Sequence, residues 1–231
     1  MKLVLFDIDG TLITSRGAGR RAMRVAFERV FGTAGGIDQY DLRGRTDTRI
    51  VHDVMGAEGW EPARVTERLD DFFEVYVGGL VAEIGDGHGV VTLPGVTAVL
   101  ERLAGSSDVV LGLVTGNIEA GARIKLGPTG LWPRFQVGAY GSDHMDRRRL
   151  PSLAARRAHA LLGREFPPTD VVVIGDTPHD VDCARACGAV AVAVATGQYP
   201  RAALLADRPD HFFEDLSDTD RVLRALLGGG A

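Results

Sequence analysis

The sequence is poor in cysteine and has no long apolar run. Its two cysteines, Cys183 and Cys187, lie four positions apart in an Ala-rich stretch of helical character. That stretch has too few Cys or His ligands for a zinc site, and disulfides are unusual in the cytoplasm, so we expect two reduced, mostly buried thiols. No apolar run approaches the 18 residues of a membrane span, and the N-terminus shows no signal-peptide pattern. We therefore expect a cytoplasmic protein with no membrane partner.

Lysine is also scarce, and the chain carries no excess of positive charge. Lys2 and Lys125 are its only lysines, and the formal net charge is -5. A negative chain has no electrostatic case for binding nucleic acid, so a small-molecule partner is favoured. We expect a monomer or a homodimer. The length of 231 residues, 45% of them apolar, predicts one large domain or one domain with an insertion.

Short apolar runs alternate with segments of helical periodicity. The runs are residues 2–6, 109–114, 171–174 and 190–195, with a weaker one at 135–140. This alternation is typical of α/β proteins with a doubly wound parallel sheet, that is, a Rossmann-like core.

The pattern changes between residues 14 and 92, where helical periodicity continues without a convincing strand. One apolar stripe is formed by Leu69, Phe72, Phe73, Tyr76 and Leu80. We expect an all-helical cap at residues 14–92, inserted into an α/β core formed by residues 1–13 and 93–231.

Acidic and hydroxyl residues follow three of the predicted strands. The segments are Asp7-Ile8-Asp9-Gly10-Thr11-Leu12, Thr115-Gly116-Asn117, and Gly175-Asp176-Thr177-Pro178-His179-Asp180. Parallel sheets bind ligands at the carboxyl ends of their strands. Four carboxylates gathered there would repel one another unless a cation neutralised them, and an acid-rich, oxygen-only pocket suits Mg²⁺.

These motifs together resemble the haloacid dehalogenase-like hydrolases, specifically the phosphatases with a helical cap after the first motif. The resemblance implies that Asp7 is a nucleophile that forms an aspartyl-phosphate, and a carboxylate needs no base to activate it. It implies that Asp9 is the general acid and base, with its backbone carbonyl on the metal. Asp7, Asp176 and Asp180 complete the implied magnesium site.

The same resemblance assigns the phosphoryl contacts. Thr115 would act in catalysis by holding the phosphoryl oxygens as charge develops. Substrate binding would also involve Gly10 and Thr11 after the first strand and Gly116 and Asn117 after the second.

The chain departs from the family at its third motif, where a lysine normally precedes a proline. Here the segment is Asp146-Arg147-Arg148-Arg149-Leu150-Pro151. An arginine can supply the positive charge, although as a bulkier planar fork. The three-residue spacing to Pro151 favours Arg148 as the catalytic cation, and Arg147 is the second choice, assigned to substrate binding. A solvated helix start without a catalytic role is the alternative.

A segment of the predicted cap, Gly44-Arg45-Thr46-Asp47, resembles phosphoglycolate phosphatase-like members of the family. Arg45 stands just before a helical stripe, so we expect it to bind the leaving group of the substrate. A surface ion pair is the competing interpretation of Arg45.

The predicted function is Mg²⁺-dependent hydrolysis of a small phosphorylated metabolite, with phosphoglycolate as the first choice. The alternatives are a sugar-phosphate phosphatase, a phosphomutase, or an inactive relative that acts as a binding protein. Asp9 argues against a dehalogenase, and the absence of lysine from residues 14–92 argues against Schiff-base chemistry. A receiver-like signalling module fits poorly, because it would be about half as long and would lack the helical insertion.

Overall fold

A computed structural model describes residues 1–228 and has a central sheet of six parallel strands. In sheet order these are β5 (Val137–Ala139), β4 (Val109–Val114), β1 (Lys2–Phe6), β6 (Val171–Gly175), β7 (Val190–Val194) and β8 (His211–Phe213). Each strand pairs in parallel with its neighbours. The predicted α/β class is confirmed, and the weak run at 135–140 is the edge strand β5. The other edge strand, β8, was not predicted because its residues stand between Asp210 and Glu214 and form no longer apolar run.

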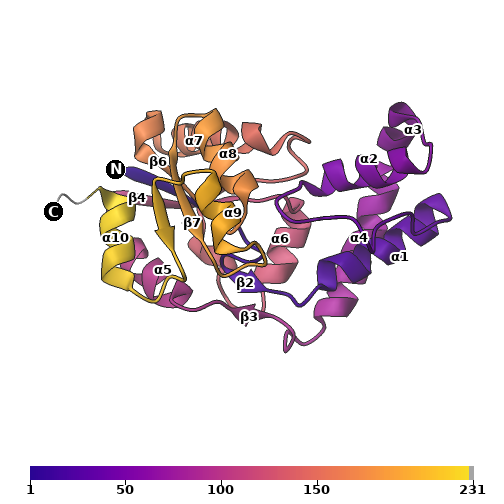
Figure 1. Cartoon of the computed structure of the whole chain (residues 1–231), viewed down its shortest axis with the longest axis horizontal. Coiled ribbons are helices and arrows are strands. Elements are labelled where there is room, and N and C mark those ends of the chain that lie inside the picture. Colours follow the sequence, from indigo (N-terminus) through magenta and orange to yellow (C-terminus); the bar gives the residue numbers. More distant parts are fainter. Residues whose placement is uncertain (229–231) are drawn as a thin grey trace.

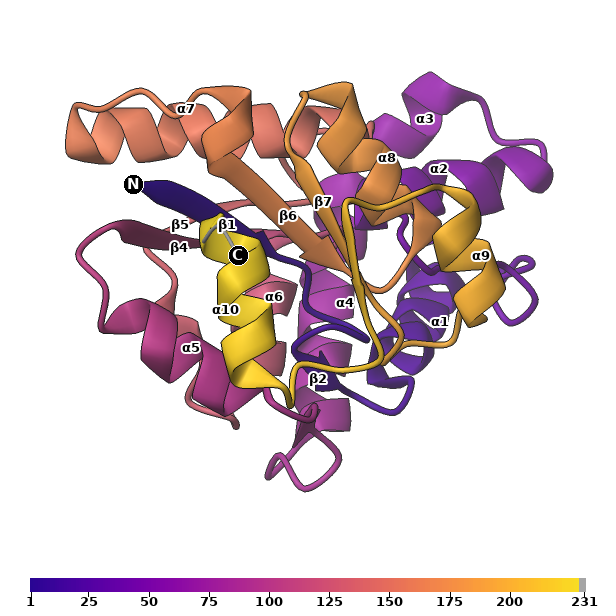
Figure 2. The same cartoon turned by 60° about the vertical axis from the view of Figure 1, so that its left-hand side comes forward.

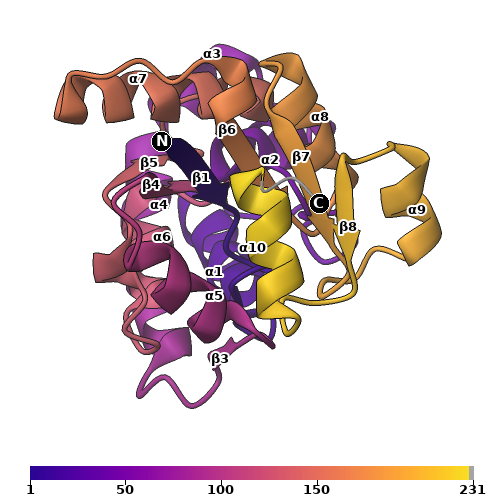
Figure 3. The same ribbon diagram turned by 90° about the vertical axis from the view of Figure 1, so that its left-hand side faces the viewer.

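Helices cover both faces of this sheet (Figure 2). One face carries α5 (Val96–Ala104), α6 (Glu119–Leu126) and α10 (Thr219–Leu227), and the other carries α7 (Leu150–Leu162), α8 (Pro178–Ala186) and α9 (Arg201–Ala206). Side chains of β1 alternate between the two layers: Val4 and Phe6 enter the first, Leu3 and Leu5 the second. Figure 3 shows β8 and α9 together at one edge of the sheet. Three short 3₁₀ turns, Trp132–Arg134, Arg147–Arg149 and Pro168–Asp170, lie in the connections.

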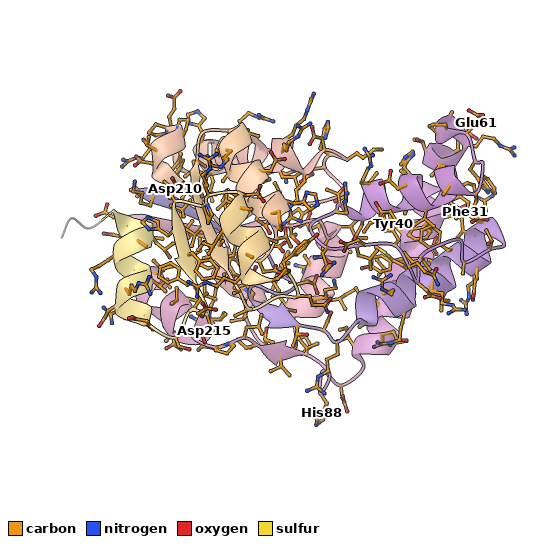
Figure 4. The ribbon with its side chains drawn as sticks, viewed as in Figure 1. Phe31, Tyr40, Glu61, His88, Asp210 and Asp215 are labelled. Atoms are coloured by element: carbon orange, nitrogen blue, oxygen red, sulfur yellow. The ribbon has the colours of Figure 1, made fainter. Side chains whose placement is uncertain are left out.

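Four further helices form a second layer of packing at one end of the molecule (Figure 1). They are α1 (Ala18–Phe31), α2 (Asp47–Ala57), α3 (Pro62–Glu67) and α4 (Leu69–Ile84). Aromatic rings fill their shared core, and the centroids of Phe27 and Phe72 lie 4.7 Å apart. Figure 4 places Phe31 among these helices and His88 on the loop that leads back to the sheet. We refer to α1–α4 as the cap helices.

The chain enters and leaves the cap helices through a small antiparallel pair that the sequence did not reveal. β2 (Ile13–Thr14) pairs with β3 (Val91–Thr92), and Ile13 lies opposite Thr92. The predicted boundaries at 13/14 and 92/93 fall on this pair, and the division into core and cap stays a prediction. Within residues 1–228, no helix has both the length and the apolar character needed to cross a membrane.

Candidate active site

Three neighbouring strands bring the predicted motifs to one edge of the sheet. Asp7 follows β1, Thr115 follows β4 and Asp176 follows β6. Because β1 lies between the other two and all three run parallel, these residues end side by side. They line one cavity of about 300 Å³, whose opposite wall is formed by cap helices and by the loop before α2.

Three buried carboxyl groups form a cluster at this edge. One oxygen each of Asp7, Asp176 and Asp180 lies within 4.8 Å of the other two. Burial, reinforced by repulsion between the acids, raises the pKa of Asp7 to about 6 and the pKa of Asp176 well above its ordinary value. The ionised cluster therefore requires positive charge nearby. A donor set made only of carboxylate oxygens fits Mg²⁺.

Local backbone geometry fixes two of these acids. Thr11 Oγ1 donates to Asp176 Oδ1 at 3.2 Å, so the side chain of this predicted substrate-binding residue is occupied in orienting Asp176. Gly10 has a φ of +86°, and a Cβ there would lie 2.4 Å from Asp176 Oδ2. The backbone N–H and hydroxyl of Thr177 donate to Asp180 Oδ2 at 3.0 and 2.7 Å. These contacts hold the side chains of Asp176 and Asp180 in the cluster.

The arginine that reaches the cluster is Arg147. Its Nη2 lies 3.0 Å from Asp7 Oδ1 and 2.5 Å from Asp180 Oδ1, and its side chain is only 7% exposed. Cys183 Sγ donates to the Arg147 carbonyl oxygen at 2.9 Å, which helps to hold this turn against α8. Arg147 therefore supplies the positive charge that the sequence analysis required at the third motif.

Arg148, the first choice for this position, does not reach the carboxylate cluster. The side chain of Arg148 is 58% exposed, and its Nε lies 3.0 Å from Asp146 Oδ1. Residues Arg147–Arg149 form a 3₁₀ turn, in which successive side chains point about 120° apart. Asp146 caps this turn by accepting from Arg148 N, and it also binds the guanidinium of Arg148. The spacing to Pro151 did not reveal which side chain faces inward.

Asp9 lies outside the carboxylate cluster, in a hydrogen-bond network of its own. Lys125 Nζ lies 2.6 Å and Asn117 Nδ2 lies 2.9 Å from Asp9 Oδ2, and Ser15 Oγ donates to Asp9 Oδ1 at 3.1 Å. Although burial acts to raise it, the pKa of Asp9 is held below its ordinary value by Lys125 and by the hydrogen bonds from Asn117 and Ser15. A contribution of the Asp9 carbonyl to a metal site stays a prediction.

The phosphoryl-binding residues predicted at β4 also line the cavity, but the side chain of Asn117 is occupied. Its Nδ2 donates to Thr115 Oγ1 at 2.9 Å as well as to Asp9, and its Oδ1 accepts from Lys125 at 2.6 Å. Gly116 lies so close to the cap that a Cβ would stand 1.9 Å from the Arg45 carbonyl oxygen. Direct contact of Asn117 with a substrate would therefore require its backbone or a rearranged side chain.

The segment before α2 fastens the cap helices to the core. Asp47 N donates to Gly116 O at 2.7 Å, and Asp47 Oδ2 accepts from Ile118 N at 2.8 Å. Thr46 and Thr48 donate to the carbonyl oxygens of Met145 and Gly141 at 2.9 and 2.8 Å. These contacts bring the side chain of Arg45 to the cavity wall. Its guanidinium makes no ion pair or hydrogen bond within residues 1–228.

The sequence analysis missed Lys125 and Asp47 as site residues. Lys125 is one of only two lysines and stands eight positions after Asn117, on the helix that begins at the end of β4. A lysine on the apolar face of a helix, so close to a motif at the end of a strand, could have been predicted as a site residue. Asp47 was quoted in its motif, but nothing in the sequence showed that it would be only 5% exposed.

Known proteins resemble the chain along nearly its whole length. Residues 148–219 match a family model described as HAD-hydrolase-like. Phosphoglycolate phosphatase from Synechococcus elongatus is 29% identical over 234 residues, which cover 98% of this chain and 99% of that protein. Pyrophosphatase PpaX from Bacillus pumilus is 26% identical, covering 97% and 95%.

Solved structures share the fold. A hydrolase from Pseudomonas syringae has a TM-score of 0.74 at 21% identity, covering 96% of this chain and 98% of that one. β-Phosphoglucomutase from Clostridium difficile has a TM-score of 0.73 at 14% identity, covering 99% and 98%. The resemblance to haloacid dehalogenase-like hydrolases that the motifs predicted is thus confirmed, and the curated relatives place the chain among phosphatases.

The positions of Arg147 and Arg148 make a first prediction. Arg147→Ala should lower kcat for p-nitrophenyl phosphate roughly 100-fold or more, because it removes the guanidinium that contacts Asp7. Arg148→Ala should stay within about threefold of wild type, since it loses only an exposed ion pair. Steady-state kinetics of both variants measure the difference. A large loss of activity in Arg148→Ala would instead support Arg148 as the catalytic cation.

Asp47 makes a second prediction, on stability. Burial raises its pKa to about 7, although Lys125 and the Ile118 N–H act to lower it. Between about pH 4 and 7 the folded protein therefore holds a proton that the unfolded chain has lost. The free energy of unfolding should then fall as pH rises, by at most about 1.4 kcal/mol per pH unit from this group.

Asp47→Asn keeps an acceptor for Ile118 N–H and removes this titration. The variant should gain stability relative to wild type between pH 5 and pH 8, with the gap constant above pH 8. Urea denaturation across this range tests it, with the exposed Asp207→Asn as a control for the lost charge. A stability difference that is independent of pH would contradict the prediction.

Proposed function

We propose that this hydrolase is a Mg²⁺-dependent phosphomonoesterase that works through an aspartyl-phosphate on Asp7. The proposal depends on one observation: the two acids of the first motif, Asp7 and Asp9, have different surroundings. Asp7 stands in the carboxylate cluster beside Arg147, whereas Asp9, two residues on, faces the cavity in a separate network. One acid is thus placed to attack a phosphoryl group and the other to move protons.

In the first step, a carboxylate oxygen of Asp7 attacks phosphorus, and the ester P–O bond breaks. The leaving alkoxide takes a proton from Asp9. In the second step, water gives a proton to Asp9 and attacks phosphorus, so that phosphate leaves and Asp7 is regenerated. The low pKa of Asp9 suits the second step, and an incoming anionic phosphoryl group raises the proton affinity of Asp9 for the first.

The remaining groups manage charge. Arg147 holds Asp7 and balances part of the negative charge of the cluster. Asp7, Asp176 and Asp180 would hold Mg²⁺, which offsets repulsion between nucleophile and phosphate. Thr115 and the backbone amides near Gly10 and Gly116 would bind the phosphoryl oxygens.

The substrate we propose is a small phosphorylated metabolite, phosphoglycolate first and a sugar phosphate second. The cap side of the cavity supports an anionic leaving group, because Arg16, Arg20, Arg43 and Arg45 all line it. The Synechococcus relative is named for phosphoglycolate, whereas PpaX is named a pyrophosphatase. A phosphomutase remains an alternative on fold, and the intact acid cluster with Arg147 argues against an inactive relative. A cytoplasmic location and a monomeric or homodimeric state stay predictions.

The proposal is tested by hydrolysis of p-nitrophenyl phosphate and a panel of phosphorylated metabolites. Wild-type protein should require Mg²⁺, and EDTA should abolish turnover until Mg²⁺ is restored. Asp7→Asn should be inactive yet folded, because the amide is nearly isosteric and a poor nucleophile. Activity retained in Asp7→Asn, or in excess EDTA, would refute the mechanism.

Arg45 allows a test of the leaving-group site. Losing a charge-assisted contact of about 1.5–3 kcal/mol should lower kcat/KM of Arg45→Ala roughly 10- to 100-fold for the best metabolite. The p-nitrophenyl ester, whose leaving group carries no additional anionic substituent for Arg45 to bind, should be nearly unaffected. Arg29→Ala, an exposed cap arginine away from the cavity, is the control. Equal effects on both substrates would place specificity elsewhere in the cap.

A further inference from the structure

Lys125 is a buried cation that the proposed mechanism does not yet use. It lies near the end of α6, and its side chain is only 6% exposed. Cap helix α1 covers the ammonium group: a Cβ on Gly19 would lie 3.3 Å from Lys125 Nζ. Gly19 thus leaves the space into which the lysine fits.

The surroundings of Lys125 do not suggest a purely structural role. Its neighbours on α6, Ala122 and Leu126, pack into the apolar layer below the sheet. An apolar side chain at a buried charged position often stabilises a protein as well as an ion pair does, because it avoids the cost of desolvating the charge. The side chains that Lys125 contacts, Asp9 and Asn117, therefore indicate its function.

Lys125 closes a ring of three side chains. It donates to Asp9 Oδ2 and to Asn117 Oδ1, both at 2.6 Å, and Asn117 Nδ2 donates to the same Asp9 Oδ2 at 2.9 Å. Asn117 is further anchored to Thr115 Oγ1. The Asp9 carboxylate cannot turn about its Cβ–Cγ bond without breaking two charge-assisted or amide hydrogen bonds.

The two oxygens of Asp9 are consequently unequal. Oδ2 accepts from two nitrogen donors, whereas Oδ1 accepts from one hydroxyl, Ser15 Oγ, at 3.1 Å. A hydroxyl can rotate and either donate or accept, so Oδ1 remains available to a leaving oxygen or a water molecule.

We infer that Lys125 is a positioning residue that pins Asp9 Oδ2, so that Oδ1 alone exchanges protons with the leaving group and with water. The inference rests on the proposed function, because it concerns the acid and base of that reaction. Lys125 itself need not touch the substrate. Its removal should leave Asp9 held only by Asn117 and Ser15, which weakens proton transfer rather than phosphoryl binding.

The experiment compares Lys125→Met with wild type on two substrates. p-Nitrophenolate leaves without protonation, whereas an alkoxide requires a proton. We therefore expect kcat/KM to fall roughly 10- to 100-fold for the alkyl phosphate that wild type hydrolyses best, and less than about threefold for p-nitrophenyl phosphate. Lys2→Met, which removes the only other lysine and its ion pair to Asp170, should leave both rates unchanged.

A double-mutant cycle separates action through Asp9 from general damage. Adding Lys125→Met to Asp9→Asn should cost no further activity, because the residue on which Lys125 acts is already disabled. Lys125→Gln, with circular dichroism and thermal unfolding as checks, replaces Lys125→Met if the latter does not fold.

Two results would overturn the inference: equal losses on both substrates, or additive losses in the double mutant. Both leave the proposed function intact. Failure of the proposed function itself is recognised separately, because wild-type protein with Mg²⁺ would then hydrolyse no phosphomonoester in the panel.

Discussion

Repulsion between acids confined at the ends of adjacent parallel strands is the constraint on which the rest of the site depends. The parallel sheet places the residues that follow β1 and β6 next to one another, and the chain puts a carboxylate at each position. Burial prevents water from screening these charges. Every other polar feature of the site can be understood as a response: a guanidinium, a lysine, backbone and hydroxyl donors, and room for a divalent cation.

Two cationic side chains, Arg147 and Lys125, neutralise the acids of the site from different sides. Arg147 contacts the cluster around Asp7 from the 3₁₀ turn Arg147–Arg149 before α7, and Lys125 contacts Asp9 from α6, on the opposite face of the sheet. The first motif runs between them. Each acid of that motif therefore has its own counter-charge, so that their environments differ although they are only two residues apart. Different roles for two like side chains follow from this asymmetry.

Sequence reasoning reached the sheet, the helical insertion and the acids because strand-end motifs and apolar periodicity are local signals. It did not identify Arg147 as the arginine that faces the cluster, because three consecutive arginines in a 3₁₀ turn differ only in where their side chains point. That orientation is set by the hydrogen bond from Arg148 N to Asp146, which caps the turn. Lys125 and Asp47 were missed for a related reason. Their burial is created by packing of the cap helices on the core: Asp47 contacts Ile118, 71 positions away, and Lys125 packs against Gly19, 106 positions away. The pair β2–β3 is too short to give a periodic signal.

That small pair has a consequence for how such a chain tolerates change. Because Ile13 and Thr92 are already held opposite one another, the ends of the intervening segment meet whatever its length. Closing a loop between fixed neighbouring ends costs entropy that grows only slowly with the number of residues. Pairing of β2 with β3 thus separates the length of the inserted segment from the geometry of the sheet. Helices of the cap can be lost, gained or replaced between these two strands while the sheet keeps its register.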